Sequence, residues 1–214
     1  MALSSQSWAT IASLATAAGT LVLAIATFAS VRSGNRAARA AEASLLVGLR
    51  PVLSPTRQGD PPQRIRFMDN HWVTAEGAAA AVDVTDSAIY VAFGVRNVGS
   101  GMAVLDRWKL LIPDEGANPP LHADPTHFRR LTRDLFVAPG DIGFWQGALR
   151  DDDAWRPAVR DALAERRLVL VELLYGDHEG GQRTITRFAL VPDGDETWTV
   201  TVSRHWSLDR TDPR

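Results

Sequence analysis

Residues 8–31 read WATIASLATAAGTLVLAIATFASV, a run of 24 residues without a charged side chain. The hydrocarbon core of a bilayer is roughly 30 Å thick and takes about 20 helical residues to cross, so this run can span it with some tilt. Its polar members are Ser, Thr and Gly, which a membrane helix tolerates because hydroxyls can hydrogen-bond to the preceding turn of backbone. We therefore predict one transmembrane helix at residues 8–31, in contact with the lipid bilayer, after a short tail at residues 1–7.

Two other interpretations of this run stay open. A cleaved signal peptide has a positively charged segment and a shorter apolar stretch. Only the α-amino group precedes this run, although Ala24-Ile25-Ala26 imitates a cleavage site. A core helix of a globular protein would be unusual at this length without one charge.

Three arginines, Arg32, Arg36 and Arg39, follow the run before the first acidic residue of the chain. Positive residues next to a membrane helix resist translocation and collect on the cytoplasmic side. Residues 1–7 carry no Lys or Arg. We therefore expect a single-pass protein of the inner or plasma membrane, with its N-terminus outside and residues 32–214 in the cytoplasm.

Residues 32–50 continue the helical pattern and predict a juxtamembrane stalk. They are rich in Ala, Arg and Leu, which are strong helix formers, and contain no proline. Pro51 biases Arg50 away from helical backbone, so the helix should end there.

One seam of this long helix carries small residues at alternating spacings of three and four. Small side chains let two helices approach closely in lipid, where packing drives association. The alternative is that alanine is so frequent here that such a seam arises by chance. The positions at which we predict contact between two copies of the helix are Ala17, Ala24, Ala38 and Ala41.

The composition limits what the rest of the chain can do. The absence of cysteine excludes disulfides, cysteine–zinc sites and cysteine nucleophiles. A net charge of −2 gives no attraction to nucleic acid, and no motif requires a cofactor. Lys109 is the only lysine beside 22 arginines, a bias typical of a GC-rich bacterial genome. Residues 51–206 are enough for one domain with its own core, before a loose tail at residues 207–214.

After Pro51 the hydrophobic pattern changes to period two and to β-branched residues, which indicates strands separated by turns. In the strand at residues 88–97, Ile89, Val91, Phe93 and Val95 share one face and should lie in the core. The other strong strands are predicted at residues 102–112, 135–138, 142–148, 168–175, 183–191 and 197–203, and weaker ones at 52–54, 65–68 and 82–84. This succession of short strands predicts a mainly β fold, an antiparallel β-sandwich.

Three stretches interrupt the strands. Residues 69–81 predict a loop or a weak strand. Residues 119–134 predict a surface excursion with a helical turn after Asp124. Residues 151–167 predict a short added helix, with acids at its start and arginines at its end as the helix dipole favours. Its apolar residues Trp155, Val159 and Leu163 should dock it onto the sheets.

The run from Asn97 to Ala103, NVGSGMA, resembles the turn between two strands of bacterial immunoglobulin-like domains. The run YGDHEGG at residues 175–181, followed by RTIT, is similar to their final hairpins. The whole chain resembles uncharacterised bacterial single-pass membrane proteins with an immunoglobulin-like β-sandwich. That resemblance implies binding or structural roles and no activity.

Candidate chemical sites are weak. His122, Asp124 and His127 could supply three metal ligands, but their spacing matches neither a helix face nor a strand face, so capping and solvent contact are favoured. The acidic groups at residues 177–179 and 193–196 are typical of turns. No nucleophile elbow or phosphate-binding glycine loop is present. We expect most tryptophans in the core, and Trp72 and Trp206 as the better candidates for surface contact.

The leading hypothesis is a non-enzymatic, membrane-tethered binding or scaffold module at the cytoplasmic face, without cofactor or metal. One alternative is a structural subunit that oligomerises through its transmembrane and stalk helix. A further alternative is an enzyme whose polar pocket has no recognisable motif.

Overall fold

The computed structural model describes residues 5–114, 119–120 and 124–209. The chain forms two compact units, Met1–Val47 and Gly48–Arg214. More of the described residues lie in strands than in helices, which confirms the prediction of a mainly β protein.

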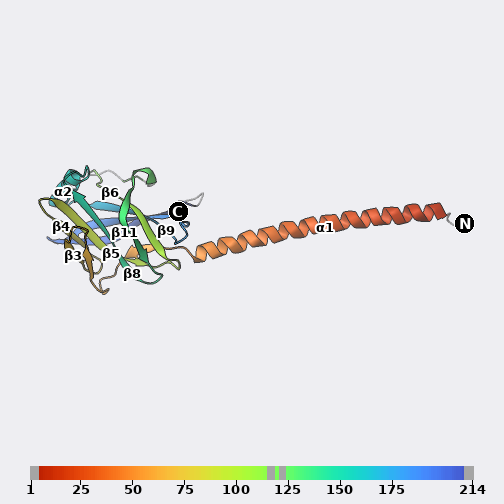
Figure 1. Ribbon diagram of the computed structural model, residues 1–214, viewed down its shortest axis with the longest axis horizontal. Coiled ribbons are helices and arrows are strands. Elements are labelled where there is room, and N and C mark those ends of the chain that lie inside the picture. Colours follow the sequence, from red (N-terminus) through yellow and green to blue (C-terminus); the bar gives the residue numbers. More distant parts are fainter. Residues whose placement is uncertain (1–4, 115–118, 121–123, 210–214) are drawn as a thin grey trace. The chain divides into compact units, whose positions relative to one another are not determined.

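The first unit is the helix α1, Ser5–Gly48, which continues unbroken through the predicted membrane run and stalk (Figure 1). By length and composition it is apolar enough to cross a membrane. Thr16, Thr20 and Thr27 each donate a hydroxyl hydrogen bond to the carbonyl four residues earlier, at 2.8–2.9 Å. These bonds satisfy the polar side chains within the helix itself, as the sequence predicts.

The second unit consists of antiparallel sheets. In the first sheet, β5 pairs with β8 along one edge, and with β1 and β4 along the other. Its strands are β1 (Leu53–Pro55), β4 (Ala80–Val84), β5 (Ala88–Asn97) and β8 (Ile142–Arg150). The second sheet, in the order β11-β10-β9-β6-β7, contains β6 (Ala103–Leu111), β7 (Arg129–Val137), β9 (Val169–Gly176), β10 (Thr184–Asp193) and β11 (Thr197–Ser207). A hairpin pairs β2 (Gln63–Arg66) with β3 (Trp72–Ala75).

The main core lies between the two large sheets. The predicted inner face of β5, which includes Phe93, is fully buried. The Phe93 ring centroid lies 5.1 Å from those of Trp145 in its own sheet and Phe188 in the other. Side chains of both sheets therefore form one hydrophobic cluster.

The opposite face of β5 is also covered. Tyr90 and Ala92 pack under Ile65 and Val73 of the β2–β3 hairpin in a second cluster. The strand β3 lies in the stretch for which the sequence predicts a loop or a weak strand. It forms because Val73 and Ala75 alternate with exposed residues and bury their side chains on the sheet beneath.

The stretch predicted as a surface excursion is partly a strand. The helical turn after Asp124 is present as η1, Pro125–His127, and the Asp124 side chain caps it. β7, however, begins at Arg129, whereas the sequence places its start at residue 135. Leu131 and Leu135 are partly buried and Val137 is buried, whereas Arg133, on the same face, is exposed. This charged residue interrupts the period-two pattern in the sequence.

The added helix α2, Arg156–Ala164, is shorter than predicted and has no acidic residue in its first turn. Asp153 precedes it and accepts a hydrogen bond from the Trp155 amide at 2.9 Å. Val159 and Leu163 are buried in the main core with Trp155 against them, as predicted.

Candidate functional site

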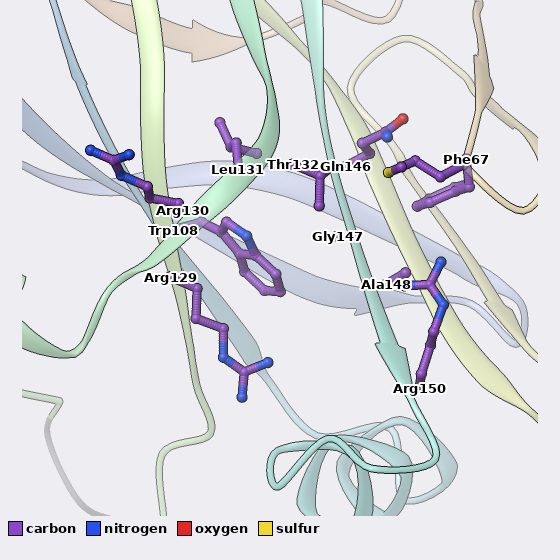
Figure 2. A pocket seen from close by; sticks show the side chains of 11 residues that line it. Phe67, Trp108, Arg129, Arg130, Leu131, Thr132, Gln146, Gly147, Ala148 and Arg150 are labelled. Carbon is purple, nitrogen blue, oxygen red and sulfur yellow. The ribbon is translucent and has the colours of Figure 1, made fainter.

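A cleft of about 200 Å³ opens between β7 and β8 (Figure 2). It is bordered by β7 of one sheet, β8 of the other and the residues that follow β2. Its lining consists of Phe67, Met68, Trp108, Arg129, Arg130, Leu131, Thr132, Gln146, Gly147, Ala148 and Arg150. Three of these residues are arginines, and none is an aspartate or a glutamate.

The strands that border the cleft are edge strands. Among the strands that the structure describes, β7 pairs only with β6, and β8 pairs only with β5. Each therefore has one edge without a partner strand. Such an edge offers backbone N–H and C=O groups for pairing with another chain.

Trp108, from β6, supplies an aromatic wall. Its ring meets Trp145 edge-on at a centroid distance of 5.2 Å and Trp155 at 5.6 Å. A Cβ atom at Gly147 would lie 2.8 Å from the Trp145 ring and 3.1 Å from the Trp108 ring. Glycine at this position of β8 therefore lets the two indoles pack beneath the cleft.

Arg129 is fixed on the β7 side of the cleft. It makes a bidentate ion pair with Asp153, in which Nη2 lies 2.8 Å from Oδ1 and Nη1 contacts Oδ2. Its guanidinium carbon lies 3.4 Å from the centroid of the Trp155 ring. Stacking and a bidentate bond together hold an arginine in one orientation.

Arg150 stands on the β8 side, so that the Trp108 ring lies between it and Arg129 in Figure 2. Its Nη2 donates to Asp69 Oδ2 at 3.0 Å, and the Tyr90 hydroxyl donates to the same oxygen at 2.8 Å. Burial by itself would raise the pKa of Asp69, but the bonds from Tyr90, the His71 amide and Arg150 outweigh it and lower that pKa. Asp69 therefore stays ionised and holds Arg150 beside the cleft.

Arg130 and Arg133 complete the basic side chains of this region. Arg133 Nη2 donates to Gln146 Oε1 at 2.9 Å and to the Arg66 carbonyl at 3.3 Å, which links β7 to β8 and to the hairpin. Arg130 is exposed and has no hydrogen bond or ion pair to any other residue that the structure describes. The cleft can thus bind an anionic group next to an aromatic wall.

The site residues predicted from the sequence all lie on α1. The side chains of Arg32, Arg36 and Arg39 are exposed, and so are those of the four small residues proposed for helix contact, Ala17, Ala24, Ala38 and Ala41. None of them lies in the cleft.

The weak metal candidate does not form a site in the described part of the chain, where no group of three or more His, Cys, Asp or Glu side chains could hold a metal ion. His122 lies outside the described residues. Asp124 caps η1, and the Thr126 hydroxyl and amide lower the pKa of its carboxyl. Asp177 likewise accepts the amides of Glu179 and Gly181 within a turn.

The two tryptophans predicted for surface contact differ. Trp72 is 48% exposed, with the Arg64 guanidinium 4.6 Å from its ring centroid. Trp206 is 3% exposed, because β11 continues beyond the predicted end of the strand and packs its indole beside Ile185 and Phe128. Trp206 is therefore a core residue.

The cleft was not predicted from the sequence. The sequence predicts Arg129 and Arg130 in a surface excursion, whereas both lie on β7, and it predicts Trp108 in the core, where the structure buries it. No spacing in the sequence links these residues to Arg150. Leu131, Leu135 and Val137 recur at even spacings, which is typical of a strand with one face turned to the core and was the signal available in the sequence.

No protein-family model matches the chain, and no curated protein matches it. Among solved structures, one titled "Crystal structure of protein from Archaeoglobus fulgidus" is similar over 61% of this chain and 94% of that chain. The two share 14% sequence identity with a TM-score of 0.25, which is too low for a conclusion about fold or function.

Proposed function

We propose that the protein is a membrane-anchored binding module. α1 crosses the bilayer once over residues 8–31 with the N-terminus outside, and residues 51–206 form an immunoglobulin-like β-sandwich in the cytoplasm that binds a partner without catalysing a reaction. The apolar length of α1 supports the span. The arginines that follow the span support the orientation, and the core between two antiparallel sheets supports the sandwich.

The observation that carries the binding role is the lining of the cleft, with three guanidinium groups and no carboxylate. A guanidinium offers five N–H donors. Arg150 uses one of its donors on Asp69, and Arg130 uses none within the described chain. Both strands therefore carry guanidinium groups with free donors, Arg150 on the side of Phe67 and Arg130 on the opposite side of the Trp108 ring in Figure 2.

We infer that the anionic group belongs to an acidic, extended segment of a partner protein. A cavity of about 200 Å³ is smaller than pockets that enclose a whole small-molecule ligand, which measure roughly 300–1,000 Å³, and it fits one side chain. The unpaired edges of β7 and β8 can meet the main chain of such a segment, because an extended peptide adds to a sheet edge by backbone hydrogen bonds.

Binding of defined peptides to the full-length protein in detergent micelles tests this function. We expect a fluorescent peptide of alternating Glu and Val to bind, and a peptide of alternating Lys and Val to bind at least tenfold more weakly. Arg130→Gln combined with Arg150→Gln should lower the affinity for the acidic peptide by at least tenfold, because each lost charged hydrogen bond is worth about 1.5–3 kcal/mol.

The matched control is Arg57→Gln combined with Arg64→Gln, which removes the same charge from exposed residues outside the cleft. It should leave the affinity within about twofold of the wild type, because exposed charges at a distance are screened by salt. Equal binding of the two peptides, or equal losses in the two double variants, would overturn the proposal.

A further inference from the structure

Arg32, Arg36 and Arg39 share one face of α1. A helix turns about 100° per residue, so spacings of four and seven residues keep the three side chains within roughly 60° of one another. Phe28, one turn before Arg32, belongs to the same face. All four side chains are exposed, and together with Val31 and Asn35 they line one shallow hollow on the helix surface.

The three guanidinium groups are not neutralised by the helix that carries them. Glu42 is the only acidic residue of α1, and no ion pair joins it to any of the three arginines in the described part of the chain. None of the three donates a hydrogen bond to another described residue either. Fifteen N–H donors, five on each guanidinium, are therefore available to a ligand on one side of the helix.

We propose that this face of α1 is a binding site for the headgroups of anionic phospholipids. The inference rests on the proposed membrane span, because a helix that crosses the bilayer up to Val31 puts its next two turns at headgroup depth. Arginine binds phosphate oxygens through two parallel N–H bonds, and the Asn35 amide can add another donor. Phe28 and Val31, at the apolar end of the hollow, contact the acyl chain of the same lipid.

The site discriminates between lipids by charge. A zwitterionic headgroup brings its own cation to the phosphate, whereas an anionic headgroup leaves the negative charge to the arginines. Each basic residue close to an anionic surface strengthens binding by roughly fivefold. Arg32 and Arg39 lie about 10 Å apart along the axis, so the face can meet phosphates at more than one depth.

The full-length chain reconstituted in nanodiscs tests this site, with equal amounts of phosphatidylcholine and phosphatidylglycerol in the disc. After extraction in mild detergent, mass spectrometry of the retained lipids measures their ratio. We expect phosphatidylglycerol to be enriched at least tenfold over the disc composition. Arg32→Gln, Arg36→Gln and Arg39→Gln together should return the ratio to within twofold of that composition.

Two further variants separate the arrangement of the arginines from their number. Exchange of Arg36 and Ala37 (Arg36→Ala with Ala37→Arg) keeps the charge but rotates one guanidinium by about 100°, and should lower the enrichment at least threefold. The triple variant Arg57→Gln, Arg64→Gln, Arg160→Gln removes three exposed arginines of the β unit and should leave the enrichment unchanged.

Equal enrichment in the wild type and the α1 triple variant would overturn the site, and full enrichment in the exchange variant would overturn its one-sided geometry. Failure of the chain to insert into discs of phosphatidylcholine alone would overturn the membrane span and the lipid site with it. Because both leaflets of a disc are alike, the result does not depend on the orientation of the protein in the cell.

Discussion

The hydroxyl of Tyr175 accepts a hydrogen bond from the Leu53 amide at 3.0 Å, so a strand in the middle of one sheet holds the first strand of the other. Both residues are fully buried. The same hydroxyl lies 2.8 Å from Thr186 Oγ1, and Thr186 Oγ1 lies 2.7 Å from His205 Nδ1. This chain of hydrogen bonds runs from the core between the sheets to the outer strand β11.

Tyr175→Phe should therefore lower the free energy of unfolding by about 1–3 kcal/mol, because the Leu53 amide stays buried without an acceptor. Chemical denaturation of the full-length protein in detergent measures the change. Tyr90→Phe is the matched control and should cost less, since Asp69 keeps its bond to Arg150 and lies at the surface. A larger loss for Tyr90→Phe would contradict the role given to Tyr175.

The far end of the same chain predicts a dependence of stability on pH. Since the Tyr175 hydroxyl accepts from Leu53, it can donate its own proton to Thr186, which can then donate to an unprotonated Nδ1 of His205. Although His205 is exposed as a residue, burial around its ring lowers its pKa below the ordinary value of 6.5. The unfolded chain thus takes up a proton near pH 6.5 and the folded chain only at lower pH.

The contribution of His205 to the free energy of unfolding is fully present above pH 6.5. It is lost as the pH falls through the pKa of His205 in the folded protein, which is the lower of the two. Unfolding measured at pH 7.5 and pH 5.0 should therefore show a smaller loss of stability at pH 5.0 in His205→Gln than in the wild type. Glutamine keeps an acceptor for Thr186 but takes up no proton. The same loss in both proteins would exclude His205 as the titrating group.

The ion pair between Glu172 and Arg187 is buried on the outer face of the second sheet, with 1% and 4% of the side chains exposed. Arg187 Nε donates to Glu172 Oε1 at 2.8 Å, and Nη2 donates to the Pro120 carbonyl at 2.9 Å. Arg187→Met should cost about 3–5 kcal/mol, because it leaves a buried carboxylate without its counter-charge.

Glu172→Leu combined with Arg187→Met should be less destabilising than Arg187→Met alone, since no unpaired charge then remains. Asp209→Ala, which breaks the exposed pair with Arg183, should cost less than about 1 kcal/mol. Additive losses in the double variant would mean that the two buried charges do not depend on each other.

The strand β5 was predicted from the sequence with both of its ends, whereas the cleft was not predicted. Ile89, Val91, Phe93 and Val95 repeat every second residue, and that local pattern is sufficient to define a strand and its buried face. The strand β3, by contrast, has only four residues. Its residue Val73 is buried because it packs on the outer face of β5, a separate segment of the sequence.

The cleft depends on pairing in the same way. Trp108 and Arg129 are brought together by the register of β6 with β7, and Arg150 reaches them because β8 pairs with β5 in the other sheet. The half-buried Arg129 is held by Asp153 and by the Trp155 ring, and both lie in a distant segment of the sequence. Local periodicity contains none of these relationships.

Phe93 links the two sheets, so its removal should affect the whole unit. Phe93→Ala should lower the free energy of unfolding by about 3–5 kcal/mol, the usual cost of truncating a buried aromatic residue. Phe136, on β7, is 60% exposed, and Phe136→Ala should change stability by no more than about 0.5 kcal/mol. Similar losses for the two variants would contradict the position of the main core.

The arginines after the apolar run also predict the orientation of the protein in the cell. A reporter that is active only in the cytoplasm should be active when it follows Arg214, because Arg32, Arg36 and Arg39 resist translocation. Replacing these three with Gln and adding three lysines before Trp8 should reduce or invert that activity. Gln at Arg57, Arg64 and Arg66 should leave it unchanged, because charges more than about 15–20 residues from the end of the membrane span, which is Val31, have little influence on orientation. Reaction of the wild-type C-terminus with an impermeant label on intact cells would show that the β unit lies outside instead.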